Sequence, residues 1–148
     1  MRKANYGKFP STKLTGMLVQ GWDSIISMLK EKMDARKVLA VDLYTGVYEE
    51  EVLDAFSKEF SGRVMNVRDL MKPEKEIQTL TERFMTEDVL FGYVTNLKLE
   101  DYLDADKVAV ARKQISEAKE TIVIIGTGAA VVAPQDAMVV YADMARWE

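Results

Sequence analysis

Short, continuous apolar runs mark the strongest strand candidates in the chain. Val38–Val41 ends at an aspartate, and Thr121–Ile125 is followed by a glycine. Runs of this length that carry no polar alternation are typical of strands buried on both faces, as in a parallel sheet. Weaker strand patterns cover Arg63–Val67 and Met138–Tyr141. These four segments are the predicted strands.

Helical periodicity fills the intervals between these strands. Apolar residues recur every three or four positions over residues 21–34, and again after the glutamates at 49–51. Pro73 suits the first position of a third helix, and Asp104 or Asp106 can cap a fourth. Each of these helices is predicted to present one apolar face.

The boundaries of these elements are predicted from glycine and from the loss of periodicity. Ser61-Gly62 is expected to close the second helix with a glycine cap, and residues 86–99 are predicted to be loop. Ala142–Glu148 begins another helical pattern, and no stop signal follows it. We therefore expect the chain to be an N-terminal piece of a longer protein.

Strands that alternate with helices predict an α/β fold. We expect three layers, in which a mostly parallel sheet carries helices on both faces. The length of 148 residues suits one hydrophobic core. Residues 1–20 are predicted to form an N-terminal arm, since Tyr6–Leu14 concentrates Gly, Pro, Ser and Thr, and residues 21–148 a single domain.

Composition narrows the class of protein. The net charge is −4 and no cluster of Lys and Arg exceeds two residues, so the basic face that nucleic-acid binding needs is not expected. No apolar run approaches the roughly 20 residues of a membrane span, and the N-terminus lacks the apolar stretch of a signal peptide. There is no cysteine, hence no disulfide. These features favour a cytoplasmic protein with neither nucleic acid nor membrane as partner.

The sequence contains no histidine. It therefore lacks the commonest general base and the commonest transition-metal ligand. A zinc site would have to use carboxylates alone, which is unusual, so neither a metal site nor a cofactor is predicted within this chain. Any catalysis would depend on Asp, Glu, Lys, Arg or Tyr.

The end of the first strand is the first candidate ligand site, with Asp42, Tyr44, Thr45 and Gly46. In open α/β sheets, ligands bind beyond the carboxyl ends of strands, where free amides of the next helix can hold an anion. The alternative is structural: Gly46 permits a turn and Asp42 caps it. The three glutamates that follow favour this alternative, because they would repel a phosphate.

Two further strand ends supply the other candidates. Gly126, Thr127 and Gly128 follow the clearest strand, but a valine stands where the dinucleotide fingerprint needs its third glycine. A tight turn is the simpler interpretation. Arg68 and Asp69 follow the second strand, and Asp143 follows the last. The carboxylates of Asp69 and Asp143 could share a proton or bind Mg²⁺. Solvated loop carboxylates are the commoner case.

Taken in order, these strand ends resemble the uridine kinase branch of the P-loop kinases. Val64–Pro73 resembles the segment that carries the catalytic aspartate there, with Asp69 at the matching position; Arg68 replaces the first acid and Leu70 the aromatic residue. The segments Phe91–Tyr93, Leu99–Asp104 and Tyr141–Asp143 resemble later motifs. The resemblance implies a P-loop kinase-like topology, but the chain has no Walker A sequence, and Tyr44–Val47 stands in its place.

A second resemblance concerns the context of the domain. Tyr6–Pro10, Val41–Val47 and Tyr141–Glu148 resemble the N-terminal extension of bacterial cupin-type mannose-6-phosphate isomerases. The resemblance implies a downstream isomerase domain as partner, which would contain the zinc and its histidine ligands.

Three functions are compatible with these observations. The first is an accessory domain of a mannose-6-phosphate isomerase, binding a phosphosugar or a nucleotide. The second is a structural module without a ligand that mediates dimerisation or packs on the next domain. The third is a non-standard kinase-like phosphotransferase, in which Asp69 is the base and Asp42 or Asp143 holds Mg²⁺.

Overall fold

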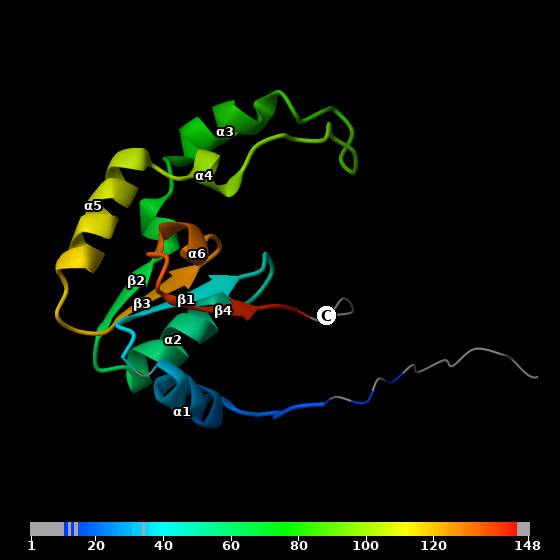
Figure 1. The fold of residues 1–148 in the computed structure, drawn as a ribbon. Helices are drawn as coiled ribbons and strands as arrows, with labels where there is room; N and C mark the ends of the chain where they lie inside the picture. The colour runs from blue at the N-terminus through cyan, green and yellow to red at the C-terminus, as the bar shows by residue number, and fades with distance from the viewer. Residues whose placement is uncertain (1–10, 12, 14, 34, 145–148) are drawn as a thin grey trace, which may run out of the picture.

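The computed structural model describes residues 11, 13, 15–33 and 35–144. The described residues form a sheet of four parallel strands in the order β2-β3-β1-β4 (Figure 1). The strands are β1 (Val38–Leu43), β2 (Arg63–Asn66), β3 (Ile122–Gly126) and β4 (Met138–Ala142). The two continuous apolar runs of the sequence thus occupy the two inner positions of the sheet.

Helices lie on both faces of this sheet (Figure 1). The described helices are α1 (Trp22–Met33), α2 (Glu49–Glu59), α3 (Glu74–Glu82), α4 (Leu99–Tyr102), α5 (Ala105–Glu117) and α6 (Ala129–Val132), together with a short 3-10 helix, η1 (Val67–Leu70). Of these, α1 and α2 cover one face of the sheet, and α5 and α6 cover the other. None of the described helices is both long and apolar enough to cross a membrane.

Alternate residues of the inner strands enter two separate cores. Leu39 and Val41 of β1 pack with α1 and α2, whereas Val38 and Ala40 pack with α5 and α6. In β3 the four side chains of Ile122–Ile125 are all at most 1% exposed. Full burial of each such side chain contributes about 1.5–3 kcal/mol relative to exposure. The predicted three-layer α/β fold with a parallel sheet is therefore confirmed.

Gly62 does not end α2 in the way that the sequence suggested. The helix ends at Glu59, and Phe60 already has an extended backbone. Gly62 is not among the residues with positive φ; instead, a Cβ built on it would lie 1.9 Å from the carbonyl oxygen of Thr121. Glycine is required here because two segments of backbone approach each other closely, not because the helix needs a left-handed cap.

Other element boundaries also differ from the prediction. Val67 belongs to η1 and not to the second strand, and Pro73 precedes α3 as its N-cap. Ala142 lies in β4, so the helix predicted from Ala142 does not begin there, and residues 145–148 lie outside the described residues. The shift at Ala142 follows from pairing: its carbonyl accepts a hydrogen bond from the amide of Tyr44, which extends the parallel ladder.

The connection between α3 and α4 contains an apolar loop, which we define as residues 84–94. It has no helix or strand, and it projects beyond α3 and α4 (Figure 1). The loop predicted over residues 86–99 is therefore found, except that α4 already begins at residue 99. The loop closes on itself, because the Tyr93 amide donates to the Phe84 carbonyl at 2.8 Å. Its exposed apolar side chains are Met85, Val89, Leu90, Phe91, Tyr93 and Val94, each at least 70% exposed.

Candidate functional site

The two inner strands continue to opposite faces of the sheet. After β1 the chain leads into α2, which packs in one core, and after β3 it leads into α6, which packs in the other. A crevice opens at the carboxyl ends of adjacent strands whose connections diverge in this way, and ligands of open α/β sheets bind there. Two of the candidate sites predicted from the sequence lie at these two strand ends.

The structure contains a cleft of about 360 Å³ at this position. We call it the switch-point cleft; its lining is Leu43–Glu50 together with Arg68 and Thr127. It brings together the predicted residues Tyr44, Thr45, Gly46, Arg68 and Thr127. Three strand ends that are far apart in the sequence therefore contribute to one concave surface.

The loop after β1 forms the floor of this cleft through a tight turn. The amide of Val47 donates to the carbonyl of Tyr44 at 3.1 Å, and Gly46 has φ of 108°. Residues with a Cβ rarely adopt such a φ, so the turn depends on glycine. A Cβ at Gly46 would also lie 2.9 Å from the sulfur of Met144. The predicted turn role of Gly46 is thus observed.

Asp42 does not cap this turn; it binds the loop after β3 instead. Its Oδ1 accepts the amide of Gly128 at 3.1 Å, and its Oδ2 accepts the amide of Ala130 at 2.9 Å. These amides belong to the N-terminal end of α6, where a carboxylate is favoured. The protein's own carboxylate therefore takes the position that an anionic ligand would need at Gly126–Gly128.

Two further contacts fill the space beside this carboxylate. The hydroxyl of Thr127 donates to the carbonyl of Leu43 at 2.9 Å, which joins the ends of β1 and β3 directly. Gly126 is buried, and a Cβ there would lie 2.9 Å from Cβ of Val67. Gly126 has φ of 135° and Gly128 has φ of 88°, so both glycines serve the tight turn that the simpler interpretation of the sequence proposed.

Arg68 reaches the switch-point cleft from the end of β2. Its Nη2 lies 3.1 Å from Oε2 of Glu49, and the other oxygen of that carboxylate accepts Nδ2 of Asn66 at 2.7 Å. Asn66 in turn caps η1, because its Oδ1 accepts the amide of Arg68 at 2.7 Å. The arginine is positioned by this pair of residues, yet its side chain remains 68% exposed.

Asn66 and Glu49 were not among the predicted site residues. Asparagine is a favoured N-cap residue, so its place before Val67–Leu70 is a signal that the sequence did contain. No signal pointed to its contact with Glu49, which lies 17 positions away.

The remaining candidates lie outside this cleft. Asp69 is exposed and lines a different cavity, of about 460 Å³, together with Lys107 of α5. Asp143 follows β4, and its Oδ1 accepts the amide of Met144 at 2.8 Å. In the part of the chain that the structure describes, no group of three or more acidic side chains is arranged to hold a metal ion.

A tyrosine that the sequence did not single out lies among these strand ends. Tyr141 of β4 is the register partner of Asp42 in β1. Partial desolvation raises the pKa of its phenol, and Asp143, Tyr44 and Asp42 act in the same direction. Two of these causes are the carboxylates of Asp143 and Asp42, whose negative charges disfavour a polyanion on that side of the crevice.

The comparison with protein families gives one match. A family model described as a domain of unknown function, DUF8485, matches residues 21–148. The chain belongs to this family. No curated protein and no solved structure matches the chain. The chemical evidence on the function of this DUF8485 domain therefore comes from its own residues.

The cleft of the DUF8485 domain offers several kinds of polar contact. Hydroxyls are supplied by Tyr44, Tyr48, Thr45 and Thr127, and Arg68 is the one cationic residue among the described residues that line the cleft. Glu49 and Glu50 provide acceptors but bring two negative charges. This set of groups suits a hydroxyl-rich ligand with one anionic group, because one arginine cannot balance a chain of phosphates.

Proposed function

We propose that this DUF8485 domain is an accessory ligand-binding domain that takes a phosphosugar in the switch-point cleft. The observation that carries the proposal is the convergence of Tyr44, Thr45, Arg68 and Thr127 on one cleft at the carboxyl ends of β1 and β3. Arg68 would bind the phosphate, and the hydroxyl and carboxylate side chains would bind the sugar hydroxyls.

A phosphosugar is favoured over a nucleotide triphosphate by the charges in the lining. A triphosphate needs a backbone cradle and a lysine, whereas this cleft has one arginine and two glutamates. The proposed role is binding and not catalysis, because both oxygens of Asp42 already accept backbone amides and Asp69 lines another cavity. The resemblance to the extension of mannose-6-phosphate isomerases supports a hexose phosphate and a downstream isomerase domain, where zinc would reside.

A thermal-shift titration tests this proposal. Mannose 6-phosphate and fructose 6-phosphate at millimolar concentration should raise the Tm, because a ligand that binds only the native state stabilises it. Mannose without phosphate, and ATP or UTP, should raise the Tm less. The Arg68→Gln variant should abolish the shift, whereas Arg63→Gln, which removes the same charge outside the cleft, should keep it. A chain that shows no shift with either sugar phosphate contradicts the proposal.

A second candidate function, an interaction module, is favoured by the apolar loop. Its exposed aromatic and aliphatic side chains lie together on a loop that is closed by its own hydrogen bonds. Exposed apolar clusters of this kind mark contact sites in proteins. Sedimentation velocity over a range of concentrations tests self-association: a dimer that dissociates in a Phe91→Ser variant supports the module, and a monomer at all concentrations contradicts dimerisation through the loop.

A further inference from the structure

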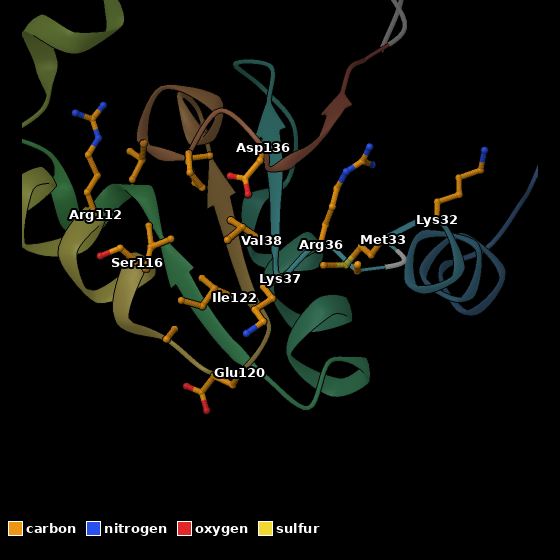
Figure 2. A pocket seen from close by; sticks show the side chains of 16 residues that line it. Lys32, Met33, Arg36, Lys37, Val38, Arg112, Ser116, Glu120, Ile122 and Asp136 are labelled. Carbon is orange, nitrogen blue, oxygen red and sulfur yellow. The ribbon is translucent and has the colours of Figure 1, made fainter.

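Another cavity lies at the opposite end of the sheet from the switch-point cleft. It has a volume of about 990 Å³ and is bounded by the starts of β1 and β3, the C-terminal parts of α1 and α5, and the segment after α6. We call it the amino-end cavity. Its floor is apolar and contains Val38, Ile122, Ile115 and Val132. Figure 2 shows Val38 and Ile122 near its centre.

Cationic side chains surround this apolar floor. Lys32, Arg36, Lys37 and Arg112 line the cavity, against the two acidic residues Glu120 and Asp136. Among the described lining residues, four positive and two negative charges give an excess of +2, although the whole chain has a net charge of −4. Within the described ranges, none of the four cations forms an ion pair. Such a local excess of one sign attracts an oppositely charged ligand.

The cations lie on different sides of the floor. In Figure 2, Arg112 is on one side of Val38 and Ile122, and Arg36 and Lys32 are on the other. Arg112 is held in place because its Nη2 donates to the carbonyl of Val131 at 2.8 Å. A guanidinium has five N–H donors in a planar arrangement, so this contact orients the group and leaves donors for a ligand.

We infer that the amino-end cavity binds an amphipathic anion, with an apolar body on the floor and one carboxylate, phosphate or sulfonate group at the cationic rim. The volume is in the range of small-molecule sites, which are mostly apolar with a few polar groups that fix orientation. A polyanion fits less well, because the cations are separated by apolar surface and by Asp136. A neutral apolar ligand would leave the rim without a partner.

Binding of anilinonaphthalene sulfonate to the folded chain is the first test. The probe combines an aromatic body with one sulfonate, so its fluorescence should rise saturably with a single site in the amino-end cavity. Decanoate and naphthoate distinguish an aliphatic from an aromatic body, and at least one should displace the probe. Decyltrimethylammonium and decanol, which lack the anion, should displace it poorly. Displacement by decanol as effective as by decanoate and naphthoate overturns the inference.

Variants locate the site. A double variant, Arg36→Gln with Lys37→Gln, should raise the Kd by about tenfold or more, the effect of losing charge-assisted hydrogen bonds. Ser116→Trp, at an exposed position of α5 that lines the cavity, should fill it and block binding with the fold retained. Lys113→Gln, on α5 but not in the lining, is the charge control and should leave the Kd unchanged.

The exposed apolar loop offers the probe a second place to bind, so the titrations are repeated in a Phe91→Ser background. Saturable binding that persists there and is lost in Ser116→Trp supports the amino-end cavity. Binding that disappears with Phe91→Ser, or that resists both Ser116→Trp and the double variant, overturns the inference. Circular dichroism of each variant confirms that the fold is intact.

Discussion

Two apolar stretches of this chain have opposite environments. The β3 stretch Ile122–Ile125 is at most 1% exposed, whereas Val89, Leu90 and Phe91 of the apolar loop are 98%, 83% and 72% exposed. Both are runs of consecutive apolar residues. Their difference shows that hydrophobicity alone does not decide burial, because the backbone of a segment must also find hydrogen-bond partners where it is buried.

The two stretches satisfy their backbones in different ways. β3 pairs with β1 on one side and β2 on the other, so the ladders use its amides and carbonyls inside the protein. In the apolar loop, Oδ1 of Asp88 accepts the amides of Leu90 and Phe91, and the hydroxyl of Thr86 donates to the carbonyl of Phe91. Local polar side chains therefore hold the loop in a conformation that needs no strand partner.

The strongest test of this contrast is a substitution that creates a cavity beside the sheet. Ile124→Ala removes a side chain that is fully buried in the core beneath α5 and α6, and should lower the free energy of unfolding by about 2–5 kcal/mol. Urea denaturation followed by circular dichroism measures it. Val139→Ala, in β4 at 54% exposure, is the control and should cost much less. Equal losses in the two variants would contradict the assignment of the core.

The carboxylate that joins β1 to α6 should have the next largest effect. Asp42→Ala leaves the amides of Gly128 and Ala130 without their acceptor, and should cost about 1–3 kcal/mol. The same urea measurement applies, with Asp69→Ala as the control, since Asp69 is exposed. If both substitutions cost the same small amount, the Asp42 contacts do not stabilise the strand ends.

A single methyl group added at position 92 should disturb the closed conformation of the apolar loop. A Cβ at Gly92 would lie 2.5 Å from the carbonyl oxygen of Phe84, so Gly92→Ala should open the loop while lowering the global stability by less than about 1 kcal/mol. Hydrogen exchange should show faster exchange of the Tyr93 amide, and limited proteolysis faster cleavage within residues 84–94. Unchanged exchange at Tyr93 would show that the loop tolerates the substitution.

The smallest effect on stability is expected at the tip of this loop. Phe91→Ser replaces a side chain that is 72% exposed, and should change the free energy of unfolding by no more than about 0.5 kcal/mol. Urea denaturation provides the measurement. A loss of 2 kcal/mol or more, the scale of a buried aromatic side chain, would mean that the loop packs on the domain in solution.

The sequence predicted the sheet well because its signal is local. The continuous run at Ile122–Ile125 and the periodic apolar positions of α1, α2 and α5 each occupy one short window, and all are found in the two cores. The α3 pattern was less informative, since α3 contains no buried residue. The segment is a helix, as predicted, but it contributes no side chain to either core.

The candidate site was only partly predictable, because its contacts join distant positions. The rule that ligands bind at strand ends led to Tyr44, Arg68 and Thr127, which share a cleft. The rule could not show that Asp42 binds the amides after β3 or that Glu49 holds Arg68. Gly62 is a similar case, since its role depends on the approach of Thr121.

The contact of Asp42 with Gly128 and Ala130 also sets an order of assembly. It joins residues 86 and 88 positions apart, and the bond between Thr127 and Leu43 spans 84. A nascent chain that has just completed β1, α2 and β2 therefore has no means of finishing the end of β1. The switch-point cleft takes shape only when β3 docks beside β1, so its formation reports the docking of β3, and a fragment ending before residue 122 should lack it.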